Sequence, residues 1–120
     1  MSVSTTKKLF FACSQNKWRS LTAEKLFEGL PGYQARSVGT QPDACVVVTE
    51  GHIGWADIIF CMERSHVDRL RRKFPEALRD KRVVCLQIPD EFGFMDPDLL
   101  EEFRAKLPPY VILSDENPKV

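Results

Sequence analysis

The sequence predicts an α/β fold in which helices cover both faces of an open parallel sheet. Residues 9–12 (Leu-Phe-Phe-Ala) and 58–60 (Ile-Ile-Phe) are short apolar runs, typical of strands buried on both faces. Between such runs lie segments in which apolar residues recur every three or four positions, the spacing of a helix that packs on a sheet. Strands that alternate with helices predict parallel pairing, because parallel strands need a crossover connection.

Local signals set the ends of the expected elements. Pro31 and Gly32 end the first helix, and Gly39 closes the second strand. Asp96 as N-cap and Pro97 in the first turn open the last helix. In chain order we expect a strand at 9–12, a helix at 20–30, a strand at 33–38, a helix at about 45–54, a strand at 56–62, a helix capped by Ser65, a strand at 83–88 and a helix from 96 through 107.

Residues 45–48 (Cys-Val-Val-Val) fit a strand and a helix equally well by pattern. We expect a helix that continues to about Gly54, because the β-α-β alternation requires a crossover at this point. The whole chain, 1–120, is expected to form a single domain with flexible ends at 1–7 and 114–120. Residues 110–113 (Tyr-Val-Ile-Leu) are apolar enough to dock on its body.

Composition narrows the class of protein. The 120 residues contain 17 Lys and Arg against 17 Asp and Glu, so no overall charge attracts nucleic acid or a membrane. No apolar stretch is long enough for a signal peptide or a membrane span. Four cysteines, at 13, 45, 61 and 85, form no CxxC pair and have no nearby histidine to complete a zinc site. A cytoplasmic protein with free thiols is expected.

The polar loop between the first strand and the first helix carries the strongest chemical signal. It contains Cys13, five residues, Arg19 and Ser20. A loop that enters a helix points backbone N–H groups into one hollow, and the helix dipole favours an anion there. The same field favours a Cys13 thiolate, Arg19 can bind two phosphate oxygens, and Ser20 can donate a hydrogen bond to the sulfur. Asn16 tolerates the left-handed backbone angles that a tight anion loop needs.

In the simplest structural interpretation, Cys13 is a core thiol and Arg19 is an exposed residue at a helix start. A Cys-x5-Arg spacing by itself is common by chance. Its position favours function, because ligands of open parallel sheets bind beyond the carboxyl ends of strands, at the start of a helix.

Three segments resemble the low-molecular-weight protein tyrosine phosphatase family, in its compact bacterial branch. Residues 11–24 (Phe-Ala-Cys-Ser-Gln-Asn-Lys-Trp-Arg-Ser-Leu-Thr-Ala-Glu) resemble its phosphate loop and first helix. Residues 37–40 (Ser-Val-Gly-Thr) are similar to its Ser-Ala-Gly-Thr turn, and residues 56–63 to its third strand. The resemblance covers roughly residues 9–107. It implies four parallel strands in the order 2-1-3-4 and a metal-independent phosphatase without a cofactor, with Cys13 as nucleophile and Arg19 on the phosphate. The residues expected to bind substrate are Ser14, Gln15, Asn16, Lys17, Trp18, Ser20 and Phe92.

The loop departs from the family pattern at three positions. Gln15 stands where Gly is common, and Leu21 where Pro follows the Arg-Ser pair. Trp18 stands where many members hold a second Cys, which protects the nucleophile as a reversible disulfide. Protection of Cys13 by a loop disulfide is therefore not expected.

The general acid is expected just after the fourth strand. A phosphotyrosine leaves as a phenolate, and a nearby acid lowers that barrier. The family carries an Asp there, usually followed by Pro and aromatics, which implies Asp90 in this chain. Asp96 imitates the Asp-Pro pair better, but its place before a helix explains it as an N-cap. Glu91 is a third candidate. Phe92 is expected either beside a flat substrate ring or as a loop anchor in the core, and Trp18 on the loop rim is another candidate for the ring contact.

The first hypothesis for function is hydrolysis of a phosphomonoester, with a phosphorylated protein or a small aryl phosphate as substrate, through a phosphocysteine on Cys13. Phosphate or sulfate ions are expected in the same loop. A non-catalytic phosphate-binding module is the alternative, favoured by Gln15 and by the missing Asp-Pro. Arsenate reduction on the same fold needs a relay of further cysteines, and Cys85 lies inside an expected strand with no cysteine after it.

Other polar features are expected to be structural. His52 and His66 lie on or beside expected helices without metal-ligand spacing, so surface or cap positions are expected. The basic residues of the third helix are expected to form a solvated face.

Overall fold

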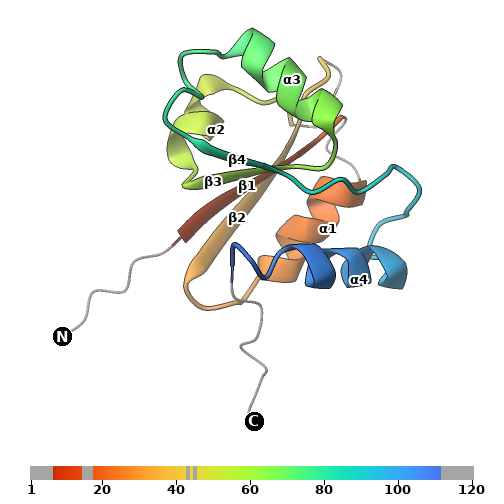
Figure 1. Cartoon of the computed structure of the whole chain (residues 1–120). Helices are drawn as coiled ribbons and strands as arrows, with labels where there is room; N and C mark the ends of the chain where they lie inside the picture. Colours follow the sequence, from red (N-terminus) through yellow and green to blue (C-terminus); the bar gives the residue numbers. More distant parts are fainter. Residues whose placement is uncertain (1–6, 15–17, 43, 45, 112–120) are drawn as a thin grey trace, which may run out of the picture.

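A computed structural model describes residues 7–14, 18–42, 44 and 46–111. Strands and helices alternate along this part of the chain (Figure 1). The elements are β1 (Lys7–Cys13), α1 (Trp18–Phe27), β2 (Tyr33–Gly39), α2 (Glu50–Trp55), β3 (Ile58–Cys61), α3 (Arg64–Lys73), β4 (Arg82–Cys85) and α4 (Pro97–Lys106).

The strands form one parallel sheet in the order β2-β1-β3-β4, which confirms the predicted fold class and strand order. Helices α1 and α4 cover one face, and α2 and α3 cover the other (Figure 1). The sheet therefore has two cores, and β1 alternates between them. Leu9 and Phe11 pack toward α1 and α4, whereas Phe10 and Ala12 pack toward α2 and α3. This alternation explains why β1 reads as a continuous apolar run.

Phe11 is central to the core on the α1 and α4 side. Its ring stacks on Phe60 with centroids 5.2 Å apart and on Phe27 at 5.6 Å, and it meets the edge of Phe103 at 6.5 Å. These residues come from β1, β3, α1 and α4, so this cluster fixes the helix that carries Arg19 against the strand that carries Cys13.

The prediction of a helix at 45–54 was wrong at its beginning. Helix α2 starts at Glu50, after Thr49 as N-cap. The preceding valines instead pair with the end of β2, since Gly39 N donates to Val46 O at 2.7 Å and Val48 N donates to Gly39 O at 3.0 Å. The β-branched side chains favour this extended conformation. Cys45 lies outside the described residues.

Two further boundaries differ from expectation. The N-cap of α3 is Glu63 and not Ser65, because the His66 side chain, at the third helical position, binds back to the Glu63 backbone. Strand β4 ends at Cys85, earlier than predicted, although Leu86 N and Ile88 N still donate to carbonyls of residues 61 and 62. Gln87 between them has a φ of 56°, which breaks the regular strand.

Helix α1 and strand β3 are also placed differently from the prediction. Helix α1 starts two residues earlier and ends at Phe27, three residues before the predicted end, because Gly29, with a φ of 84°, already leaves the helix before Pro31 and Gly32. Strand β3 spans 58–61 and not 56–62. The Asp96 side chain accepts from Asp98 N at 2.8 Å, which confirms it as the N-cap of α4. Within the described residues, no helix is long and apolar enough to cross a membrane.

Candidate active site

Cys13 is the last residue of β1, and its side chain is buried at the start of α1. Its Sγ lies 3.0 Å from Ser20 Oγ, the contact that the sequence predicted. The backbone around it is held by the turn after β2, where Thr40 N donates to Cys13 O and Gln41 N donates to Ser14 O, both at 2.9 Å. The sulfur is therefore fixed from two elements.

Arg19 is a buried charged residue, with 4% of the residue exposed. Its Nη1 donates to Glu63 Oε2 at 2.5 Å and to Ile88 O at 2.9 Å. Glu63 follows β3 and Ile88 follows β4, so the carboxyl ends of the two strands hold the guanidinium beside the end of β1. A buried cation supported in this way attracts an anion and orients it through its planar fork.

Asp90 lies at the same site. Its Oδ1 is 3.8 Å from Arg19 Nε, and 67% of its side chain is exposed. A carboxyl group that contacts a buried arginine and reaches water can exchange protons with solvent or with a ligand bound beside it. By contrast, Asp96 is occupied as the α4 N-cap, and Glu91 is an exposed residue of the loop before it.

Ser14 and His66 connect the nucleophile loop to α3. His66 Nδ1 accepts from Glu63 N at 3.0 Å, so the neutral ring carries its proton on Nε2, which donates to Ser14 Oγ at 3.1 Å. Burial, and after it the charge of Arg19, lowers the pKa of His66 to about 4. The ring is therefore neutral at physiological pH. The histidine is a cap, as one of the expected alternatives held, but it is buried and not a surface residue.

Of the other residues predicted to bind substrate, the structure describes Trp18 and Phe92. Gln15, Asn16 and Lys17 lie outside the described residues. Trp18 is the first residue of α1 and is 52% exposed. Phe92 is partly buried and packs against the core on the α1 and α4 side, which agrees with its interpretation as a loop anchor.

Glu63 and His66 are site residues that the sequence analysis did not assign to the site. The available signal was positional: residue 63 follows a buried strand that neighbours β1, so it had to lie at the same edge of the sheet as Cys13. The arrangement as a whole is a thiol at a helix start, a buried arginine and an exposed carboxyl group. Within the described part of the chain, no group of three or more His, Cys, Asp or Glu side chains could hold a metal ion.

Comparison with known proteins identifies the fold. No protein-family model and no curated protein matches the chain. The low molecular weight protein tyrosine phosphatase SP-PTP from Streptococcus pyogenes superposes over 92% of this chain and 96% of its own, with a TM-score of 0.72 and 17% identity. The chain has the fold of the low-molecular-weight protein tyrosine phosphatases.

Two other structures with this fold differ in their stated activity. The tyrosine phosphatase Wzb from Escherichia coli K30, in complex with phosphate, matches 85% of this chain and 94% of its own, with a TM-score of 0.69 and 18% identity. The YwlE arginine phosphatase from Geobacillus stearothermophilus matches 88% of this chain and 98% of its own, with a TM-score of 0.63 and 22% identity. The low-molecular-weight phosphatase fold is thus shared by proteins named for two phosphorylated side chains.

Proposed function

We propose that this protein is a cysteine-dependent phosphomonoester hydrolase that acts through a phosphocysteine intermediate. The observation that carries the proposal is the 3.0 Å contact between Cys13 Sγ and Ser20 Oγ, at the start of the helix that also carries the buried Arg19. A hydroxyl donor stabilises a thiolate, and the arginine draws a phosphate dianion to it. Such chemistry suits a reducing cytoplasm, where the thiol stays free.

In the first step the Cys13 thiolate attacks phosphorus, and the S–P bond forms as the bond from phosphorus to the leaving oxygen breaks. Arg19 holds equatorial oxygens of the transferring group, with its guanidinium oriented by Glu63 and Ile88 O. Asp90 donates a proton to the leaving oxygen, which departs as an alcohol or phenol.

In the second step water attacks the phosphocysteine. Asp90, now a carboxylate, accepts a proton from this water, and the S–P bond breaks to give inorganic phosphate and the Cys13 thiolate. Ser20 donates to the sulfur again as it leaves. A solved structure of the same fold, 20% identical to this chain, is a cysteine-to-serine mutant of the YwlE arginine phosphatase with a phosphorylated active site serine. That structure supports a covalent route.

Protein phosphotyrosine is the substrate class that we propose. Structural neighbours named as tyrosine phosphatases support it. Another structure of this fold, Wzb from Vibrio vulnificus, is in complex with benzylphosphonate, which carries a phenyl ring next to a phosphonate group. In this chain the exposed Trp18 ring at the loop rim offers a flat apolar surface to a phenyl group.

The experiment is turnover of para-nitrophenyl phosphate, a phosphotyrosine peptide and phosphoarginine without added metal. We expect the two aryl phosphates to be hydrolysed and Cys13→Ser to abolish their turnover while phosphate binding, measured by calorimetry, persists. Turnover that survives in Cys13→Ser would contradict the mechanism. Preference for phosphoarginine would retain the mechanism and contradict the substrate class.

The two alternative functions predict different behaviour of the same protein. A non-catalytic phosphate-binding module would bind phosphate and give no burst of para-nitrophenol. Arsenate reduction would need reactive partner thiols, but burial raises the pKa of Cys61 to about 12, which suppresses its thiolate. Cys61 is therefore a poor partner thiol for that reaction.

A further inference from the structure

The outer edge of β2 is one of the two edges of the sheet, away from Cys13 at the end of β1. β2 is the edge strand of the sheet and pairs with β1. Lys7 N donates to Gly32 O and Thr40 N donates to Cys13 O, each at 2.9 Å, so the backbone groups of even-numbered residues in β2 point toward β1. Since strand geometry alternates, the backbone groups of odd-numbered residues point outward.

Part of this edge is already paired. The outward groups of Gly39, at the end next to the candidate active site, bind Val46 and Val48. Four residues before Gly39, Ala35 also points its N–H and C=O outward. No backbone group in the described residues pairs with them. A strand edge in this state is a template for another extended segment.

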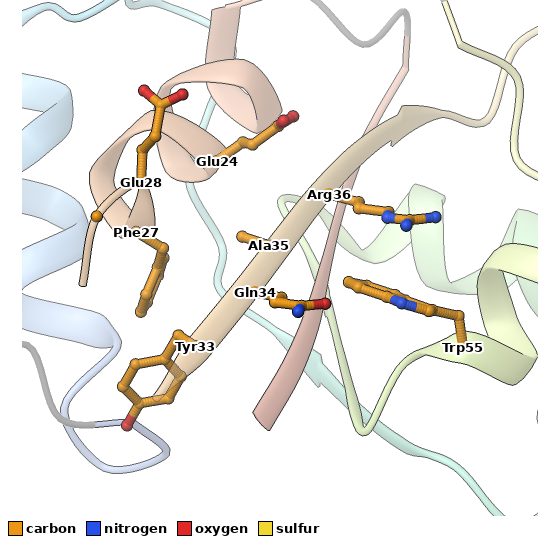
Figure 2. Close-up of a pocket in the computed structure, with 9 residues that line it drawn as sticks. Glu24, Phe27, Glu28, Tyr33, Gln34, Ala35, Arg36 and Trp55 are labelled. Atoms are coloured by element: carbon orange, nitrogen blue, oxygen red, sulfur yellow. The ribbon is translucent and has the colours of Figure 1, made fainter. Parts of the chain in front are cut away.

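A pocket of about 300 Å³ lies along this open stretch. Figure 2 shows its walls: side chains of α1 lie on one side of β2, and Arg36 and Trp55 lie on the other. The floor on the α1 side includes the Phe27 ring, whose centroid is 5.3 Å from that of Tyr33. The two walls thus border the open strand edge on both sides.

The two walls carry opposite charges. Glu24 and Glu28 line the α1 side, where Glu24 accepts from Ser37 Oγ at 2.5 Å and Glu28 is weakly paired with Lys25 at 3.4 Å. On the other side, the Arg36 guanidinium lies 4.4 Å from the centroid of the Trp55 ring. An added strand would point successive side chains alternately at the carboxylates and at the guanidinium.

We infer that the β2 edge binds an extended peptide as a fifth strand, with basic side chains toward Glu24 and Glu28 and acidic side chains toward Arg36. The backbone of Ala35 supplies hydrogen bonds, and the charged walls select alternating basic and acidic residues. The site is separate from Cys13 and does not depend on the proposed phosphatase activity.

A second copy of this chain fits the edge less well. Two antiparallel β2 strands related by a two-fold axis would keep their α1 sides on the same face of the joined sheet. The acidic side chains Glu24 and Glu28 of both copies would then gather on one face of the joined sheet, and both Arg36 side chains on the other. Like charges opposite each other across a strand pair are destabilising, so a peptide of complementary charge is the favoured occupant.

The test uses an eight-residue peptide of alternating Lys and Glu and a control peptide of the same composition in the order Lys-Lys-Glu-Glu, which mixes the charges on each face. We expect tighter binding of the alternating peptide to the full chain, measured by NMR titration. Hydrogen exchange at the Ala35 amide should slow by at least tenfold when the peptide saturates the site. N-methylation of alternate peptide nitrogens should abolish this protection.

Charge reversal supplies matched variants. Glu28→Lys should weaken binding of the alternating peptide about fivefold, the scale expected for exposed charge pairs. Glu101→Lys, an equally large change at an exposed position of α4, should leave it unchanged. Equal affinity for both peptides, or binding without protection of Ala35, would overturn the proposal. Concentration-dependent dimerisation with protection of Ala35 in the absence of peptide would overturn the choice of occupant.

Discussion

At the scale of single residues, the site depends on how Arg19 and its neighbours are held. A guanidinium that is 4% exposed is costly to bury, and Glu63 together with Ile88 O offsets that cost. Asp90 approaches the Nε edge of the same group from solvent. Arg19 is thus contacted both by the groups that hold it in place and by the proposed general acid. Substitution of one residue at a time can separate these contributions.

Asp90→Asn tests the proposed general acid. The amide cannot supply a proton to the leaving oxygen, so kcat for para-nitrophenyl phosphate should fall about 10²–10⁴-fold. Steady-state kinetics across pH measure it, and the loss should be smaller for substrates with better leaving groups. Asp96→Asn is the control, because Asn caps a helix as well as Asp does, and kcat should not change. A loss confined to Asp96→Asn would identify a different acid.

His66 predicts a dependence of stability on pH. Its pKa is about 4 in the folded protein and near 6.5 when exposed. As pH falls from about 6.5 to about 4, the unfolded chain takes up a proton that the folded chain excludes. The free energy of unfolding should therefore keep its full value above pH 6.5. It should fall by up to about 3 kcal/mol as the pH is lowered through this window.

Urea unfolding of wild type and His66→Gln at pH 7.5 and 4.5 measures this effect. Gln does not titrate, and its side-chain N–H can still reach Ser14, so the variant should lose this part of the pH dependence. An unchanged difference between the two pH values in His66→Gln would show that other groups produce it.

At the scale of secondary-structure elements, the β3–α3 junction joins the site together. Glu63 is the N-cap of α3, its backbone N–H binds the His66 ring, and its side chain binds Arg19. The His66 ring in turn binds Ser14, next to the nucleophile. One junction therefore orients both the cation and the loop, and a change there should affect catalysis and folding together.

Glu63→Ala should lower the free energy of unfolding by about 2 kcal/mol, because it leaves the buried Arg19 without its carboxylate, while the 38% exposure of Glu63 moderates the loss. It should also lower kcat/KM for aryl phosphate, because Arg19 loses its orientation. Asp68→Ala is the matched control in the same helix: it removes the exposed 3.5 Å pair with Arg64 and should cost no more than about 0.5 kcal/mol. Urea denaturation compares them, and equal losses would contradict a special role for Glu63.

At the scale of the whole molecule, the two cores fix the helices against the strands of the sheet. Phe11 touches the rings of Phe27, Phe60 and Phe103, and it lies two residues before Cys13 on the same strand face. Packing of α1 against β1 therefore sets the position of Arg19 relative to the sulfur. Stability and site geometry should respond to the same core substitutions.

Phe11→Ala should lower the free energy of unfolding by about 3–5 kcal/mol, a large part of the total for a domain of this size. Phe11→Leu keeps most of the volume and should lose less than half as much. Chemical denaturation measures both, and kcat for aryl phosphate should persist in Phe11→Leu. A Phe11→Ala variant as stable as wild type would contradict the central place of this ring cluster.

The sequence by itself determined the alternation of strands and helices, the N-cap at Asp96, and the Cys13, Arg19 and Ser20 constellation. These features rest on local periodicity and on residues close together in the chain. Only the tertiary structure decided that residues 46–48 pair with Gly39, that Glu63 caps α3, and that Glu63, His66 and Asp90 meet Arg19 and Ser14. The contacts of Arg19 with Glu63 and Asp90, and of Ser14 with His66, join residues about 40–70 positions apart, brought together because parallel strands end at one edge of the sheet.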